Sequence, residues 1–502
     1  MNNEKRKIDI RKIGEKWDIS GAITIYHKKE RIYKDFFGLA NRETGEKINE
    51  ESTYLFTGAS RFLLSASILM LSDMKKLNLN DTIDKYIPEY ANEHKIKIKH
   101  LILGESGIRD YFYGKIMLEL NNDEKHNSLE ERNRTVEEKR MYTKSYSFEE
   151  VLKLIGDDKL EFEPEAEKAN YSTTENVFCK EIIERVSGMN LLEFEFKYIF
   201  EPLNMSQTKK GRNVNTNTYF NFRDNELVLA KIDDTASDLF VTTADDIEKL
   251  MLALYEDMVL SDEKSSSSTK LLSSKSWKKA LSFNEENIGL GFSSVNGTIC
   301  VDEFDLLGNE VSMYFNKEAE LCYMQLSNAN IIVENIAGTW LHFRKEMRSE
   351  IDSFFTYPKN TRIVPYNKKN WYDVMSLEIS KDQYEFVCDA KQSIAYTFAY
   401  QEDHKLFVEM EGDKPVGLMV LKANKKKDEY HFAILLVDRR YQGRGYGKIM
   451  VEWALEYFRK QGAKELTIGV NRFNISAQRL YKSVGFKDDL VYEEGMLLKV
   501  IL

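Results

Sequence analysis

The sequence contains little cysteine and no long apolar run. Its four cysteines lie far apart in 502 residues and form no Cys-x-x-Cys pair; they are Cys179, Cys300, Cys322 and Cys388. This spacing argues against a disulfide framework or a cysteine-rich metal site, so we expect reduced thiols, no metal and a cytoplasmic protein. No apolar segment follows the charges of the N-terminus, which predicts no signal peptide. No apolar run reaches the roughly 18 residues needed to cross a membrane, so we expect no membrane partner.

The chain also has no excess of basic residues. It carries 72 lysines and arginines against 82 aspartates and glutamates, a formal net charge of −10. This balance argues against nucleic acid as a partner and fits a small cationic substrate. Hydrophobic residues make up 42% of the sequence, which is enough to build hydrophobic cores. The length predicts two or three domains.

The most informative stretch lies near the C-terminus. Leu435–Val437 is a short apolar run typical of a buried strand, and a glycine-rich turn, Gln442–Lys448, follows it. Apolar residues at i, i+4 spacing then predict a helix that ends at Gly462. A second strand is expected at 466–470, and Asn474 is expected to cap a last short helix.

The glycine-rich turn suggests an anion site. Gly443, Gly445 and Gly447 allow a tight turn and a close approach to a ligand at a helix N-terminus, where N–H groups are unpaired. A Walker A loop is excluded, because Ile449 follows Lys448 where a hydroxyl is needed. A Rossmann fingerprint fails because its third glycine would fall at Lys448. An ordinary strand–helix turn remains the alternative.

Two motifs in this stretch resemble the GNAT acetyltransferases. Gln442, Gly445 and Gly447 match the Gln-x-x-Gly-x-Gly signature of that family. Residues 474–486 resemble its closing motif, Asn-x-x-Ala-x-x-Leu-Tyr-x-x-x-Gly-Phe, in the expected order and spacing. The resemblance extends over 370–502 and implies a mixed-sheet domain that transfers an acetyl group from acetyl-CoA to an amine.

The resemblance also implies roles for individual residues. Tyr481 would be the acid that protonates the leaving thiolate, with a merely packed tyrosine as the alternative. The main-chain N–H of Val437 would polarise the thioester carbonyl. Acetyl-CoA would be held by Leu436, Val437, Gln442, Gly443, Arg444, Gly445, Tyr446, Gly447, Lys448 and Asn474.

No motif identifies the base that must deprotonate the amine. His431 and Glu429 alternate on the strand before the thioester site and could share a face. A core or surface histidine is the plainer interpretation of His431. Glu409 and Glu411 also alternate and could bind the charges of a polyamine, or they could form a solvated strand face.

Part of the domain resembles the spermine/spermidine acetyltransferases more closely. The resemblance rests on residues 370–372, 377–379 and 386–395. Where those relatives tend to have Trp-Arg, this chain has Ala433-Ile434, so the substrate is expected to be a polyamine or another small cationic amine. A homodimer through this domain is a further expectation.

The first two thirds of the chain resemble the serine beta-lactamase and penicillin-binding-protein-like family. A strand at 21–26, a helix from residue 60, and several later segments occur in the family's order over roughly residues 15–350. Those segments include Phe162-Glu163-Pro164, Ile182–Gly188 and Phe200–Met205. The implied fold is an antiparallel sheet flanked by helices plus a helical region, so the whole chain would combine α/β and α+β domains.

The catalytic motifs of that family are altered. Ser60-Arg61-Phe62-Leu63 keeps the serine of Ser-x-x-Lys but has leucine in place of lysine. Tyr171-Ser172-Thr173 lacks the asparagine of Tyr-x-Asn, and the third motif would fall at Asp302-Glu303-Phe304. These changes favour a binding or scaffold domain. A hydrolase that uses Ser60 unconventionally is the alternative, although an arginine at position 61 is a poor base.

The expected boundaries are 1–352 for the first domain, 353–367 for a linker and 368–502 for the acetyltransferase domain. A helix over 331–347 would end the first domain. The charge-dense residues 112–147 are expected to form a solvated insertion, and the serine-rich residues 262–268 a flexible loop. A third hypothesis for the whole chain is a regulatory protein in which both folds only bind ligands.

Overall fold

The computed structural model describes most of the chain. It describes residues 10–502 except 91–94, 117–143, 157–159, 165, 167–171, 222–226, 260–269, 285–286, 296, 307, 331, 335–339, 343–346, 349–350, 353–354, 356–360, 381–382, 413 and 425. The chain divides into two compact units, one made mainly of Asp9–Val333 and the other mainly of Lys345–Leu502. Each unit has its own sheet and its own hydrophobic core.

The N-terminal unit contains a six-stranded antiparallel sheet in the order β10-β11-β12-β13-β1-β2. The register pairs Ala22 of β1 with Leu326 of β13, and both side chains belong to the hydrophobic core. The strand expected at 21–26 is confirmed. The strand bounds are β1 Gly21–His27, β2 Glu30–Phe37, β10 Ser293–Val295, β11 Thr298–Leu306, β12 Asn309–Asn316 and β13 Leu321–Ser327.

Helices pack against this sheet and against one another. The central helix is α2, Arg61–Asp73, which begins after its cap Ser60 and contacts α7, α3, α8 and β11. Most of its side chains are buried, because it lies between the sheet and the helical region. The other helices include α1 Ile10–Lys16, α3 Ile98–Leu103, α6 Phe148–Ile155, α7 Thr173–Ser187, α8 Leu191–Glu195, α9 Ala244–Val259 and α10 Ser274–Ala280.

Short strands complete the N-terminal unit. They form small two- and three-stranded sheets such as β5-β9-β6. Their bounds are β3 Leu39–Asn41, β4 Glu46–Lys47, β5 Thr53–Thr57, β6 Lys209–Lys210, β7 Tyr219–Asn221, β8 Leu227–Leu229, β9 Leu239–Thr243, β14 Ala329–Asn330, β15 Ile332–Glu334 and β16 Trp340–His342.

The C-terminal unit is built on a seven-stranded mixed sheet in the order β17-β18-β19-β20-β21-β23-β22. Neighbouring strands are antiparallel except β20 and β21, which run parallel. The bounds are β17 Thr361–Pro365, β18 His404–Glu411, β19 Lys414–Asn424, β20 Glu429–Val437, β21 Glu465–Asn471, β22 Lys487–Tyr492 and β23 Gly495–Ile501.

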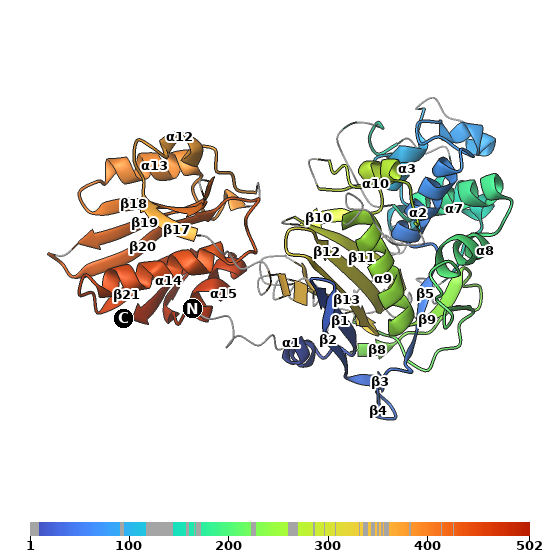
Figure 1. The fold of residues 1–502 in the computed structure, drawn as a ribbon, viewed down its shortest axis with the longest axis horizontal. Coiled ribbons are helices and arrows are strands. Elements are labelled where there is room, and N and C mark those ends of the chain that lie inside the picture. The colour runs from blue at the N-terminus through green and yellow to red at the C-terminus, as the bar shows by residue number, and fades with distance from the viewer. Residues whose placement is uncertain are drawn as a thin grey trace, which may run out of the picture. The chain divides into compact units, whose positions relative to one another are not determined.

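Helices cover both faces of this sheet. α12 (Trp371–Val374) and α13 (Ala390–Ala399) lie on one face, and α14 (Tyr446–Arg459) and α15 (Ile475–Ser483) lie on the other (Figure 1). The hydrophobic residues divide in the same way, with Leu406 and Leu418 under α12 and α13, and Phe407 and Met419 under α14. The expected helices and strands of this unit are therefore confirmed.

Two expectations near the domain boundary are wrong. Strands β15 and β16 replace part of the helix expected over 331–347, because their β-branched and aromatic residues favour strands. The linker expected over 353–367 is too long, since β17 pairs with β18 at the edge of the C-terminal sheet. Pro365 is tolerated at the end of this edge strand. Most of the insertion expected at 112–147 and the loop at 262–268 lie outside the described residues.

Candidate active site

The parallel strands β20 and β21 separate along their length. Their pairing joins His431 to Thr467 and Phe432 to Ile468, and within these fully described strands it extends no further. A register shift in the β19–β20 ladder between Val420 and Leu421 leaves Ala433 as an extra residue in β20. The second half of β20 consequently has one main-chain edge that β21 does not cover.

Hydrogen bonding shows which main-chain groups face that edge. The N–H of Asp438 donates to the carbonyl of Val416 at 2.9 Å. Bonded and non-bonded pairs alternate in an antiparallel ladder, so Leu436 bonds toward β19, whereas Leu435 and Val437 point to the uncovered edge. The expectation for Val437 fits this geometry. The contact expected from Leu436 does not fit, because its main-chain groups bond to β19. Leu435 faces the uncovered edge in its place.

The glycine turn follows directly after β20. Gly443 has φ 75° and Gly445 has φ 90°, and Gly445 is the N-cap of α14. The first bonds of the helix run from the N–H groups of Lys448 and Ile449 to the carbonyl of Gly445. The N–H groups of residues 445–447 precede these bonds at the positive end of the helix. They form a site suited to a phosphate or pyrophosphate.

Two further residues of the turn, Tyr446 and Gly447, can offer a ligand only their main-chain groups. A Cβ at Gly447 would lie 3.1 Å from Cδ2 of Leu480 on α15, so the absence of a side chain lets the two helices approach. Tyr446 is buried, and burial together with a hydrogen bond to Glu411 raises the pKa of its phenol. The Tyr446 side chain is therefore committed to the sheet, and only its N–H is placed for a ligand.

The turn also carries two cations. The guanidinium of Arg444 lies 5.7 Å from the ring centre of Tyr441. The ammonium of Lys448 lies 3.9 Å from a carboxylate oxygen of Glu452, one helical turn later. An ion pair this long on an exposed helix face is weak, so the Lys448 charge is available to an anion at the helix N-terminus.

The side chain of Gln442 is held within the protein. Its Nε2 donates to the carbonyl of Val437 at 2.8 Å and to Oε1 of Gln383 at 2.8 Å. Both hydrogens of this amide are thus used, and Gln442 fixes the turn to the end of β20. The expected contact of Gln442 with the co-substrate has no support from this arrangement of its side chain.

Asn474 and Tyr481 lie on α15. Asn474 accepts a bond from the N–H of Ala477 at 3.1 Å, which confirms the expected cap. Tyr481 is only 5% exposed and packs against Phe486 in the core shared with α14. Burial raises the pKa of the Tyr481 phenol, so the hydroxyl keeps its proton at neutral pH.

His431 belongs to one of the two residue pairs that join the parallel strands. The Thr467 hydroxyl donates to the carbonyl of Tyr430 at 3.3 Å, and Nδ1 of His431 lies 2.9 Å from that hydroxyl. A hydroxyl has a single hydrogen, so Nδ1 must be the donor and Nε2 carries the lone pair. Burial, followed by the charges of Lys422 and His404, lowers the pKa of His431, which keeps the imidazole neutral. A neutral, oriented imidazole is suited to accept a proton.

The three glutamates considered in the sequence occupy different environments. Glu429 is exposed and lies 3.8 Å from the ammonium of Lys422. Glu409 is 0% exposed, and its carboxyl oxygens have no hydrogen-bond partner within the described residues. Burial, and then the nearby Glu411 carboxylate, raise the pKa of Glu409 to about 9. The solvated strand face that was the alternative for Glu409 and Glu411 is therefore wrong for Glu409, which is neutral at pH 7.

In the N-terminal unit, Ser60 is buried and accepts a bond from the N–H of Leu63 at 3.5 Å. The guanidinium of Arg61 donates to the carbonyl of Ile102 through Nε at 3.1 Å and Nη2 at 2.9 Å, and so is directed at the α3 backbone. Leu63 is fully buried. Tyr171 and the side chains of 302–304 lie outside the described residues.

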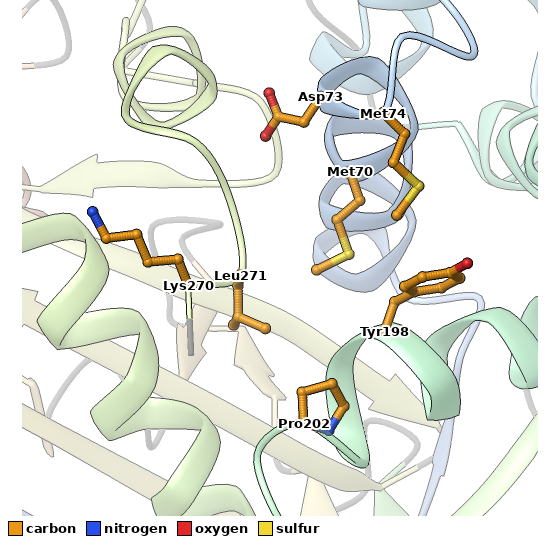
Figure 2. A pocket seen from close by; sticks show the side chains of 7 residues that line it. All are labelled: Met70, Asp73, Met74, Tyr198, Pro202, Lys270 and Leu271. Carbon is orange, nitrogen blue, oxygen red and sulfur yellow. The ribbon is translucent and has the colours of Figure 1, made fainter. Parts of the chain in front are cut away.

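A cavity of about 400 Å³ opens at the far end of α2 (Figure 2). It is lined by Met70, Asp73, Met74, Tyr198, Pro202, Lys270 and Leu271. Its lining begins at Met70, ten positions after Ser60, a distance of roughly 15 Å along the helix. The Asp73 carboxylate accepts bonds from Ser273 and Ser276, so it holds the N-terminus of α10, whose cap is Ser273.

Sequence reasoning missed three residues of the C-terminal site. Gln383 bonds the turn, Thr467 orients His431, and the buried Asp438 accepts bonds from the N–H groups of Glu378 and Arg440, each at 2.9 Å. A charged residue at the end of an apolar strand was a usable signal for Asp438. Gln383 and Thr467 belong to no motif, and only tertiary contact reveals them.

Comparison with known families agrees with this geometry. Residues 10–331 match the Beta-lactamase family model, which is more than half of the chain. The chain belongs to the beta-lactamase family. Residues 371–486 match the model of the Acetyltransferase (GNAT) family. The beta-lactamase domain is therefore followed by a GNAT acetyltransferase domain, and the expected fold classes are confirmed.

The beta-lactamase domain has a hydrolase among its curated relatives. The teichoic acid D-alanine hydrolase of Staphylococcus aureus is 21% identical over 189 residues, 38% of this chain and 40% of that protein. The chain thus spans well under half the length of the curated relatives it matches. The family match does not distinguish a spermine/spermidine subtype of the GNAT domain.

Two solved structures align with this chain at low sequence identity. FmtA from S. aureus aligns with a TM-score of 0.50 at 19% identity and covers 69% of this chain and 88% of that chain. A penicillin-binding protein from Bacillus halodurans aligns with a TM-score of 0.49 at 18% identity, covering 64% and 95%. Among the described residues, no helix combines the length and apolar character of a membrane span.

Proposed function

We propose that the GNAT domain transfers the acetyl group of acetyl-CoA to a primary amine. The observation that carries this proposal is the juxtaposition of the turn at 442–448 with the uncovered edge of β20. The turn offers N–H groups and Lys448 to a pyrophosphate. The edge offers the N–H groups of Leu435 and Val437 to the arm and carbonyl of the thioester.

In the proposed reaction, the amine nitrogen attacks the thioester carbonyl. The nitrogen–carbon bond forms, the carbon–sulfur bond breaks, and the Val437 N–H stabilises the oxyanion between these steps. Nε2 of His431 accepts the proton that the ammonium must lose. The Tyr481 phenol donates a proton to the leaving thiolate. Because its pKa is raised, the phenol releases this proton only to a strong base.

The acceptor we propose is a small cationic amine. The chain carries a net charge of −10, which favours a cation over an anion as substrate. A polyamine is one member of this class. Ala433 and Ile434 offer no charge or aromatic ring to such a substrate, so the class is proposed rather than the individual amine.

We propose a binding or scaffold role for the beta-lactamase domain. Leu63 occupies the position of the lysine, and Arg61 is directed at the carbonyl of Ile102. Neither residue can take the proton of Ser60. The alternative, a serine hydrolase, has support from the name of the S. aureus relative and from the presence of Ser60. Labelling by a fluorescent penicillin that is lost in Ser60→Ala would favour that alternative.

The location and assembly of the protein are also proposals. Four free cysteines suit a reducing compartment, as does a substrate of the acetyl-CoA class, so we propose the cytoplasm. We also propose a homodimer through the GNAT domain. The edge strand β22 exposes Leu490, Val491 and Tyr492, which could pair with a second copy. Analytical ultracentrifugation of the protein and of Val491→Lys tests this assembly.

Calorimetric titration tests the co-substrate. The full-length protein should bind acetyl-CoA and CoA at one site, and the affinity should fall with added salt because a pyrophosphate is bound by N–H groups and Lys448. The absence of binding would contradict the proposed function. Binding without turnover would favour the third hypothesis, a protein whose two folds only bind ligands.

A further inference from the structure

Two glutamines far apart in sequence form a reciprocal amide pair beside the turn. Nε2 of Gln442 donates to Oε1 of Gln383 at 2.8 Å, and Nε2 of Gln383 donates to Oε1 of Gln442 at 3.1 Å. Oε1 of Gln383 also accepts a bond from the N–H of Ser380 at 3.2 Å. With the bond from Gln442 to Val437, a continuous series of hydrogen bonds joins the end of β20, the turn and the segment between α12 and α13.

A second set of bonds joins the same segments. The buried carboxylate of Asp438 accepts a bond from the N–H of Glu378 at 2.9 Å, and the N–H of Arg439 donates to the carbonyl of Glu378 at 2.7 Å. Burial opposes ionisation of Asp438, but bonds from Arg440 and from main-chain N–H groups lower its pKa overall. Asp438 is thus charged at neutral pH and anchors the start of the turn, and Gln383 anchors Gln442, four residues later.

The turn needs such an anchor because of its composition. Gly443 and Gly445 have positive φ angles and no side chains, so packing does not restrain them. A ligand that binds a flexible turn must order it, which weakens the affinity. Gln442 is the residue before these glycines. Its side chain bonds to the Val437 carbonyl at the end of β20 and to the side chain of Gln383.

We propose that Gln383 is a positioning residue that pre-organises the turn for the pyrophosphate of acetyl-CoA. It touches neither the thioester nor the amine in this proposal, and it acts through Gln442. The segment between α12 and α13 thereby contributes to donor affinity from the sheet face opposite α14. The inference rests on the proposed function, because it assigns the pyrophosphate to this turn.

The test compares two donors that share the thioester and the pantetheine arm. S-acetyl-pantetheine lacks the pyrophosphate and the adenosine of acetyl-CoA. In the full chain, Gln383→Ala should raise the calorimetric Kd of acetyl-CoA about tenfold, as expected for the loss of a pair of hydrogen bonds. The affinity of S-acetyl-pantetheine, measured by competition, should not change. Gln383→Glu, which keeps the acceptor for Gln442, should have an intermediate effect.

Gln392→Ala is the matched control. Gln392 lies on α13, which covers the same face of the sheet. Its side chain accepts a bond from the N–H of Asp389 at the cap of that helix. It should leave both affinities unchanged. Equal weakening of both donors in Gln383→Ala, or no weakening of either, would overturn the inference. If the unmodified protein binds no acetyl-CoA, the proposed function itself fails, and that outcome is distinct from a variant with unchanged affinity.

Discussion

Nδ1 of His431 lies 2.9 Å from Oγ1 of Thr467, across one of the two residue pairs that join β20 and β21. This contact sets the tautomer of the imidazole at the point where the two strands begin to separate. It gives the GNAT domain an oriented, neutral nitrogen, which is the base in the proposed reaction.

The pH dependence of turnover tests this assignment. Burial lowers the pKa of His431 below its ordinary value of 6.5, so the acidic limb of kcat should lie below that pH. His431→Gln should remove the limb and lower kcat by about 100-fold or more. Thr467→Val keeps the imidazole but frees its tautomer, and should lower kcat by about tenfold with little change in KM. A limb that persists in His431→Gln would exclude His431 as the base.

Glu409 makes the stability of the GNAT domain depend on pH. Its pKa is about 9 when folded and 4.5 as a free side chain, so the folded state holds a proton that the unfolded state loses. Stability attributable to Glu409 is therefore complete below pH 4.5 and decreases as the pH rises toward 9. Glu409→Gln should remove this decrease and raise Tm at pH 8 by roughly 3–6 °C relative to the unmodified chain.

Thermal unfolding of the full chain at pH 5 and pH 8 measures this effect. Glu429→Gln is the control, because Glu429 is exposed on β20 of the same sheet and should change neither value. An equal change of Tm at both pH values in Glu409→Gln would show that the carboxyl is not protonated in the folded protein.

Backbone strain at the turn gives a third test. Gly445 has φ 90° at the N-terminus of α14, and Gly462 has φ 81° just after its C-terminus, with open space around it. Alanine at either position should destabilise the fold by about 1 kcal/mol. Only Gly445→Ala should also raise the Kd of acetyl-CoA, by about fivefold. Equal Kd values for the two variants would place the co-substrate away from the turn.

Tyr481→Phe separates chemistry from packing. The phenol is buried against Phe486, so phenylalanine should fill the same space and leave Tm within about 1 °C. Loss of the proton donor should lower kcat about 100-fold, with an unchanged KM for acetyl-CoA. Unaltered turnover would show that Tyr481 is a packing residue, the alternative interpretation of its motif.

The parts of the site that the sequence predicted share one property. The positive φ angles of Gly443 and Gly445 and the cap at Asn474 depend on local backbone conformation, which local sequence determines. The individual helices and strands were predictable for the same reason, since their periodicity lies within single segments. The mixed sheet was expected only from the resemblance to the GNAT family.

The parts that the sequence did not predict depend on long-range contacts. The role of Gln383 arises from a bond to a residue 59 positions away, and Thr467 meets His431 across 36 positions. The burial of Glu409 also could not be predicted, because an acidic residue on a strand is usually solvated. The main-chain direction of Leu436 required the register of the β19–β20 ladder.

Acetyl-CoA turnover across a panel of amines tests the central claim most directly. CoA thiol release would be followed with spermidine, spermine, aminoglycosides, amino acids and N-terminal peptides. Our account predicts saturable release with a small cationic amine, accompanied by an equal amount of N-acetylated product. Binding of acetyl-CoA without thiol release above the hydrolytic background, for every amine in the panel, would contradict it.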